Sequence, residues 1–191
     1  MRISGGVLKG RNVASRKAFS AGHGSDELRP TSAKVREAIF DILRSEIQGS
    51  VFLDLYAGTG AVGIEALSRG AGRIILVEKN HVRSQAVRDY IKEIKASDRA
   101  SICREKAEYF LKRAAAAGAT FDIIFADPPY SSDEMSKIFD LLKDNDVLKD
   151  GGTLIVEHHC KSRMPENTHP FSLVKNYRYG DTMLTLYRKE K

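Results

Sequence analysis

Three glycines with the spacing G-x-G-x-x-G stand where an apolar run gives way to a helical pattern. They are Gly58, Gly60 and Gly63, and Tyr56 and Ala57 lead into them from the end of the run. In such a loop the first glycine allows a tight turn, the second lets a ligand approach the backbone, and the third packs helix against strand. Because a strand precedes the glycines and a helix follows them, we expect these five residues to form part of a nucleotide-cofactor site.

Two carboxylates near this loop indicate which cofactor it takes. Glu78 ends the next apolar run, about 20 residues after the first glycine, where a carboxylate can accept both ribose hydroxyls. Taken alone, Glu78 would also fit a surface position at a strand end. Asp54 lies four residues before Gly58, where the diphosphate of a dinucleotide would otherwise lie. Its charge disfavours NAD and favours a cofactor with positive groups, such as S-adenosylmethionine with its ammonium and sulfonium.

A second motif, Asp-Pro-Pro-Tyr, follows the apolar run at 121–126 and consists of Asp127, Pro128, Pro129 and Tyr130. Its prolines fix φ and remove two backbone donors, which makes a rigid platform at the sheet edge where ligands bind. Asp127 and the Pro128 carbonyl are expected to accept both hydrogens of an exocyclic amine, while a base stacks on Tyr130. Methyl transfer to that nitrogen then depends on positioning and electrostatics. The alternative is a Pro-Pro turn with an incidental aromatic residue.

Strand-like and helical patterns alternate along most of the chain and must position these residues. The apolar runs cover 51–56, 73–78, 100–103, 121–126 and 153–158, and helical patterns lie near 60–70, 81–96, 106–117 and 133–144. This order predicts an α/β fold of the Rossmann-like type, with a doubly wound, mostly parallel sheet. Two further runs, 172–179 and 182–189, predict an antiparallel hairpin at the end of the chain.

Positive charge is concentrated in the first quarter of the chain. Residues 1–44 contain nine basic and four acidic side chains and so hold +5 of the formal net charge of +6. This is typical of an arm that contacts a polyanion, although a solvated, flexible N-terminus would look the same. A helix capped by Thr31 or Ser32, with an apolar stripe from Val35 to Leu43, closes the segment. We therefore expect a basic arm and helix (1–48) and a catalytic domain (49–191).

Other features of the composition exclude several classes of protein. The 191 residues contain neither 18 consecutive apolar residues nor an apolar signal region, so we expect a cytoplasmic protein without a membrane segment. Cys103 and Cys160 stand alone and fit reduced thiols. The pair His158 and His159 has no third ligand at a usable spacing, so no metal site is expected.

Four segments together resemble the RsmD family, the bacterial 16S rRNA guanine-N2 methyltransferases. They read RISGG–GR at 2–11, RPTSAKVREAIFDIL at 29–43, DLYAGTGAVGIEALSRGA at 54–71 and FADPPY at 125–130. The resemblance implies a class I methyltransferase fold with a seven-stranded sheet and an N-terminal extension that acts on the ribosomal substrate. It also implies Asp54, Gly58, Gly60 and Glu78 at S-adenosylmethionine, and the residues from Asp127 to Tyr130 at the target amine.

In one place the sequence departs from the pattern of this class. Members commonly carry an acidic residue just after the third strand, which binds the adenine amine of the cofactor. Here Lys106 takes that position, so either Glu105 or the backbone of Ala107 is expected to replace it.

The resemblance to the RsmD family implies 16S rRNA as the substrate, and we expect a monomer to bind it within a small-subunit assembly particle. Phosphate contacts are expected from five basic residues of the arm: Arg2, Lys9, Arg11, Arg29 and Arg36. Two alternatives remain, which are a DNA adenine-N6 methyltransferase and a non-catalytic RNA-binding module on the same fold.

Overall fold

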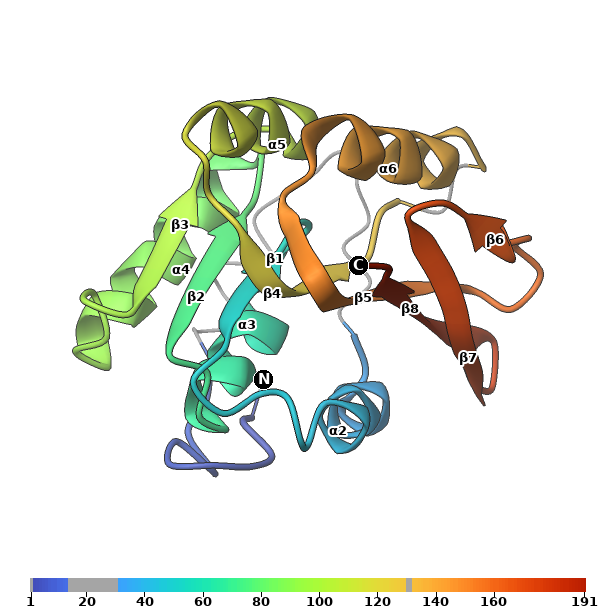
Figure 1. Cartoon of the computed structure of the whole chain (residues 1–191). Coiled ribbons are helices and arrows are strands. Elements are labelled where there is room, and N and C mark those ends of the chain that lie inside the picture. Colours follow the sequence, from blue (N-terminus) through green and yellow to red (C-terminus); the bar gives the residue numbers. More distant parts are fainter. Residues whose placement is uncertain (1, 14–30, 130–131) are drawn as a thin grey trace.

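A mixed sheet runs through the molecule between two layers of helices (Figure 1). The computed structural model describes residues 2–13, 31–129 and 132–191. The strands are β1 (Val51–Asp54), β2 (Arg73–Val77), β3 (Ala100–Cys103), β4 (Phe121–Ala126), β5 (Leu148–His159), β6 (Asn167–Thr168), β7 (Phe171–Tyr179) and β8 (Thr182–Lys189). The helices are α2 (Ala33–Ile42), α3 (Ala61–Ser68), α4 (His81–Glu93), α5 (Ala107–Ala116) and α6 (Ser132–Asn145).

The sheet has the strand order β3-β2-β1-β4-β5-β8-β7-β6. Strands β1 to β5 are parallel, whereas β8 is antiparallel to β5 and pairs on its other side with β7. The predicted mostly parallel sheet of seven strands with an antiparallel hairpin is therefore confirmed. The two-residue strand β6 adds an eighth strand at the edge, which the sequence patterns do not predict because it is too short to show an alternation.

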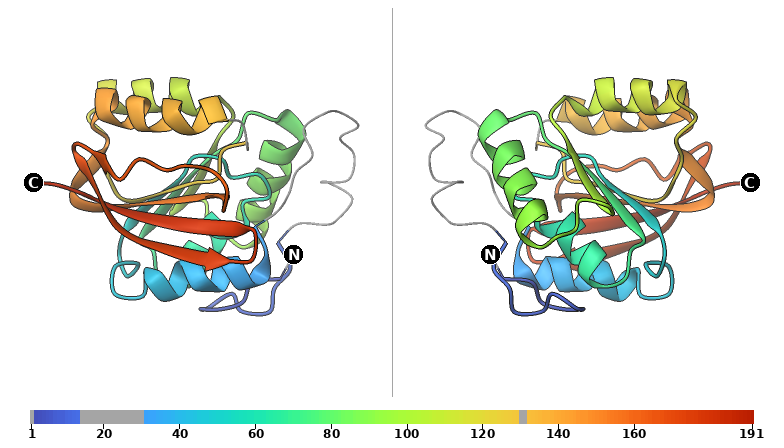
Figure 2. Two further views of the ribbon diagram at one scale, coloured as in Figure 1. Left: turned by 90° about the vertical axis from the view of Figure 1, so that its right-hand side faces the viewer. Right: turned by 90° about the vertical axis from the view of Figure 1, so that its left-hand side faces the viewer.

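Two hydrophobic clusters fill the space on either side of the sheet. Helices α5 and α6 cover one face, and α2 and α3, together with α4 beside them, cover the other (Figure 2). Successive residues of a strand point to opposite faces, so Phe52 belongs to the cluster under α2 and α3 while Leu53 belongs to the cluster under α5 and α6. Both faces of the central strands are buried, which explains their continuous apolar runs.

Helix α2 begins where its cap residue predicts. The Ser32 side chain accepts a hydrogen bond from the backbone N–H of Val35 at 3.2 Å, which satisfies one free donor of the first turn. Residues Ile3 and Val13 of the N-terminal segment are buried in the same cluster as α2 and α3. No helix in the described part of the chain is long and apolar enough to cross a membrane.

Candidate functional site

The carboxyl ends of the central parallel strands meet at one edge of the sheet, and their register determines which residues lie level. Asp54, the last residue of β1, is paired with Leu76 on β2 and with Phe125 on β4. Phe125 is in turn paired with Ile155 on β5. Leu76, Phe125 and Ile155 all belong to the cluster under α2 and α3, so Asp54 points to that face as well.

Another carboxylate lies two residues beyond each of these three paired residues on β2, β4 and β5. Glu78 follows β2, Asp127 follows β4, and Glu157 lies near the end of β5. Because side chains alternate with a period of two, these three carboxylates are placed on the same face as Asp54 and one step nearer the edge. Glu78 and Asp127, which the sequence predicts as site residues, therefore lie at the same edge of the sheet as Asp54. Glu157, which the sequence does not predict, lies there as well.

Asp54 is held almost entirely out of solvent. Its side chain is 1% exposed, and its Oδ1 has no hydrogen-bond partner among the described residues. Burial raises the pKa of Asp54 to about 7, while backbone N–H groups of Tyr56 and Gly63 act in the opposite direction and the charges of Glu78 and Glu157 add to the rise. A buried acceptor without a partner suits a cationic or hydrogen-bonding group of a ligand.

Glu78 accepts hydrogen bonds from two backbone N–H groups, one in the glycine loop and one at the start of α4. Its Oε2 accepts the N–H of Gly58 at 3.0 Å, and its Oε1 accepts the N–H of Asn80 at 2.7 Å. Burial raises the pKa of Glu78, whereas these N–H groups and the charge of Arg83, 3.9 Å away, lower it. An ionised carboxylate has about four lone-pair sites, so each oxygen retains capacity for one ribose hydroxyl.

The glycine loop has the shape that its spacing predicts. Gly60 caps α3 in the left-handed region with φ of 74°, a conformation that glycine adopts without steric cost. At Gly63 an added Cβ would lie 2.1 Å from Leu76 Cδ2, so this glycine lets α3 pack directly on β2. Of the two residues before the loop, Ala57 is buried and its N–H donates to the Val77 carbonyl at 2.9 Å, and Tyr56 is half-buried.

The Asp-Pro-Pro-Tyr motif follows β4 at the same edge. Asp127 is half-buried, Pro128 is buried and Pro129 is exposed. Tyr130 lies outside the described residues, so its stacking role stays a prediction. The motif continues the strand next to β1, which brings the proposed amine acceptor beside the proposed cofactor loop.

The two candidates for the adenine contact lie at the start of α5. Glu105 pairs with Arg113 at 2.5 Å, and Ala107 is the buried first residue of the helix. Lys106 occupies the cap position and its side chain makes no capping hydrogen bond. Both assignments stay predictions.

Three of the predicted RNA-contacting residues lie on the surface. Arg2, Lys9 and Arg11 are exposed, and the Arg2 Nε donates to the Gly10 carbonyl at 3.0 Å. Arg29 lies outside the described residues.

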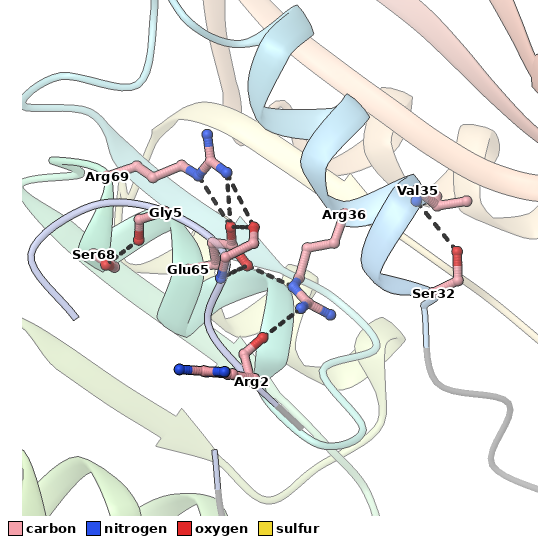
Figure 3. A network of polar contacts seen from close by, with 9 residues as sticks. Arg2, Gly5, Ser32, Val35, Arg36, Glu65, Ser68 and Arg69 are labelled. Atoms are coloured by element: carbon pink, nitrogen blue, oxygen red, sulfur yellow. Dashed lines mark hydrogen bonds and ion pairs between the residues drawn. The ribbon is translucent and has the colours of Figure 1, made fainter. Parts of the chain in front are cut away.

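For Arg36 the prediction of an RNA contact is wrong, because this side chain is only 1% exposed. Its Nε lies 2.5 Å from Glu65 Oε2, and its Nη2 donates to the Arg2 carbonyl at 2.7 Å (Figure 3). Glu65 is itself fully buried, and such a carboxylate requires a counter-charge. The sequence does indicate that Arg36 is buried, since Arg36 shares a helical face with the apolar residues Phe40 and Leu43.

The same buried carboxylate fastens the N-terminal segment to α3. Glu65 also accepts hydrogen bonds from the hydroxyl of Ser4 and from Arg69, whose Nη2 lies 2.9 Å away (Figure 3). Burial opposes ionisation of Glu65, but the hydrogen bonds from Ser4, Arg36 and Arg69 lower its pKa overall. The exposed cations of the arm are therefore presented by a segment that is docked on the body of the protein.

The two histidines at the end of β5 have different surroundings. His158 is 2% exposed, its Nε2 lies 2.7 Å from Thr185 Oγ1, and burial lowers its pKa. His159, Cys160 and Asp181 bring their ligand atoms within 4.8 Å of one another. The spacing argument does not find Asp181, because the β7–β8 hairpin brings it back to β5.

The fold and this edge of the sheet define a protein of the class I methyltransferase fold. An RNA methyltransferase from Salinibacter ruber, solved in complex with S-adenosyl-L-homocysteine, has the same fold with 13% identity and a TM-score of 0.65, and the match covers 85% of this chain and 94% of that chain.

Residues 1–188 match the model of the family described as Conserved hypothetical protein 95, and the chain belongs to that family. It is 33% identical over 190 residues to Ribosomal RNA small subunit methyltransferase D of Escherichia coli (strain K12), which covers 100% of this chain and 90% of that protein. The solved structure of yhhF from Escherichia coli is 32% identical with a TM-score of 0.83, and the match covers 100% of this chain and 98% of that chain. The resemblance to the RsmD family is confirmed.

Proposed function

We propose that this protein transfers a methyl group from S-adenosylmethionine to the exocyclic N2 of a guanine in small-subunit rRNA. The observation that carries the proposal is the set of carboxylates at the carboxyl edge of β2, β1 and β4: Glu78, Asp54 and Asp127. The name of the Escherichia coli relative, Ribosomal RNA small subunit methyltransferase D, supports small-subunit rRNA as the substrate. The exposed cations Arg2, Lys9 and Arg11 support an RNA partner.

The residues of the glycine loop fit S-adenosylmethionine better than a dinucleotide. Asp54 places a buried carboxyl group beside the loop, and its unpartnered Oδ1 suits an ammonium donor, which would favour the ionised form of this carboxyl group. Glu78, held by the N–H groups of Gly58 and Asn80, is positioned for the ribose hydroxyls. When bound, the cofactor supplies an electrophilic methyl group on a positively charged sulfur. The row of carboxylates favours that positive charge electrostatically.

At the amine, the roles of Asp127 and the Pro128 carbonyl follow from hydrogen bonding. An aryl amine is a poor nucleophile because its lone pair is delocalised into the ring. Accepting both of its N–H bonds favours a pyramidal nitrogen whose lone pair faces the methyl group. That lone pair would take the methyl group from S-adenosylmethionine, held by Asp54 and Glu78, and the nitrogen would then lose one proton. Asp127, which accepts an N–H bond of the amine, is the nearest acceptor for that proton. Catalysis in this proposal depends on the position of Asp127 and requires no covalent intermediate.

The substrate is proposed to be rRNA within a small-subunit assembly particle, approached by a monomer through the basic arm. Arm and catalytic domain share one hydrophobic cluster through Ile3 and Val13, so the arm is positioned by packing.

The test is the variant Asp127→Ala, assayed on small-subunit particles from cells that lack the protein. S-adenosylmethionine affinity should stay within a factor of two or so of wild type, while methyl transfer should fall at least about a hundredfold, as when a group acting only in the transition state is removed. Nucleoside mass spectrometry should find 2-methylguanosine after reaction with wild type. Methyl transfer by Asp127→Ala at a near-normal rate, or a different methylated nucleoside, would contradict the proposal.

A further inference from the structure

A cavity of about 310 Å³ lies beside the site just described, on the β5 side. It is bounded by the start of α2, by Glu157 on β5 and by the turn between β7 and β8. Its volume is at the lower end of the range for ligand pockets. The cavity is separated from the glycine loop by β4, so it lies on the substrate side of the edge rather than on the cofactor side.

Glu157 connects this cavity to the proposed amine acceptor. Ala126 and Val156 are paired in adjacent parallel strands, so Asp127 and Glu157 follow at the same level. Neighbouring strands lie about 4.8 Å apart, which is close to the width of a six-membered ring with its substituents. A base whose amine is held at Asp127 therefore has its ring edge within reach of Glu157.

The Glu157 side chain is buried, and it accepts a hydrogen bond that fixes its position. It is 4% exposed, and its Oε2 accepts the hydroxyl of Thr31 at 3.1 Å. Thr31 directly precedes the Ser32 cap of α2, so the start of this helix fixes the carboxylate at the cavity wall.

The remaining walls suit a nucleotide. Tyr179 and Val35 supply an aromatic and an apolar surface, Ser32 and Thr182 supply hydroxyls, and Lys34 supplies an exposed positive charge. An aromatic face binds a base by stacking, hydroxyls bind sugar oxygens, and a lysine at the mouth suits a phosphate.

We propose that this cavity takes the target base and that Glu157 is the residue that selects guanine, by accepting the ring N1–H. The inference rests on the proposed methyl transfer to an exocyclic amine. In guanine the ring nitrogen beside the amine is a donor. In adenine and cytosine the corresponding nitrogen is an acceptor, and its lone pair would face the lone pairs of the carboxylate. Glu157 thus favours guanine and rejects the other two amines.

The test compares guanine with 2-aminopurine, which has the same exocyclic amine but an N1 acceptor. Mass spectrometry first locates the guanosine methylated by wild type, and a substrate RNA is then made with either base at that position. Wild type should methylate the guanine RNA at least about tenfold more efficiently in kcat/KM, because the analogue loses a hydrogen bond to a charged group. This comparison requires no variant. Equal rates on both RNAs would overturn the inference while leaving the proposed function intact, whereas absence of 2-methylguanosine would overturn both.

The variant Glu157→Gln tests the residue itself, because its amide can donate to the N1 of 2-aminopurine. We expect kcat/KM to fall about tenfold or more on the guanine RNA and to be retained on the 2-aminopurine RNA, so that the preference disappears. Glu37→Gln, at an exposed position of α2, makes the same charge change and should leave both rates unchanged. A purely structural role for Glu157 would lower both rates equally, and that result would overturn the inference. Unchanged S-adenosylmethionine affinity confirms that Glu157→Gln is folded.

Discussion

Replacing Asp54 by Asn is expected to stabilise the protein at neutral and alkaline pH while weakening its cofactor site. Asp54 is 1% exposed and its Oδ1 has no partner among the described residues, so its charge is costly in the cofactor-free protein. The substitution keeps the size of the side chain and removes the charge. Binding of S-adenosylmethionine should fall about tenfold or more, because the proposed acceptor for its ammonium group loses its charge.

The magnitude follows from the pKa of Asp54. Burial is the main reason that this pKa rises from 3.8 to about 7. The folded protein therefore keeps the proton to a higher pH than the unfolded chain, and wild-type stability falls as pH rises from about 4 through about 7. Because a tenfold change in proton affinity is about 1.4 kcal/mol, the full rise corresponds to about 4 kcal/mol. Asn does not titrate, so the free energy of unfolding of the Asp54→Asn variant, relative to that of wild type, should increase by about this amount between pH 4 and pH 8.

Urea unfolding of both proteins without cofactor, at a series of pH values, measures this difference. Contributions from other carboxylates are present in both proteins and largely cancel. The part of the difference in free energy of unfolding that is constant with pH reflects how well the Asn amide fits its site. Only the part that changes with pH reflects the ionisation of Asp54. A difference that does not change with pH, or that decreases as pH rises, would refute the reasoning about Asp54.

Three further predictions concern the ribose contact, the buried ion pair and the arm. Glu78→Ala should weaken S-adenosylmethionine binding by about tenfold or more in calorimetry, since a buried acceptor held by two N–H groups is lost; undiminished affinity would exclude the ribose role. Arg36→Met should lower the free energy of unfolding by about 3 kcal/mol because it leaves the buried Glu65 short of a counter-charge, and Arg36→Met combined with Glu65→Leu should recover part of the loss. The double substitution of Lys9 and Arg11 by Ala should weaken binding to small-subunit particles and flatten its dependence on salt, by somewhat under one in the log–log slope per lost contact. An unchanged slope in filter binding would show that these two cations do not touch RNA.

The local parts of the site could be predicted because their signals are local. A strand, three spaced glycines and a helix lie within 13 residues, from Val51 to Gly63, and the geometry of Gly60 and Gly63 follows from that order. The level of Glu78 relative to Asp54 also follows, since parallel strands end at the same edge.

Contacts between distant segments could not be predicted in the same way. Arg36 donates a hydrogen bond to Glu65, which is 29 residues away in the sequence, and Thr31 donates one to Glu157, which is 126 residues away. In the sequence the apolar helix face of Arg36 indicates burial but not which residue it contacts, and Glu157 is an ordinary acidic residue near a strand end. Their roles depend on how α2 packs across the face of the sheet, and no short motif encodes that packing.

The position of β8 in the sheet has a consequence for synthesis of the chain. β8 is made after all its partners, yet it lies between β5 and β7 and pairs with β5 from Thr153 opposite Arg188 to His159 opposite Thr182. Until residues 182–189 have left the ribosome, β5 has an open edge with apolar residues on both faces. Such an edge can pair with other chains. The wall of the cavity formed by Tyr179 and Thr182 is likewise absent from the nascent chain, so the protein reaches its substrate-binding form only when its last strand enters the sheet.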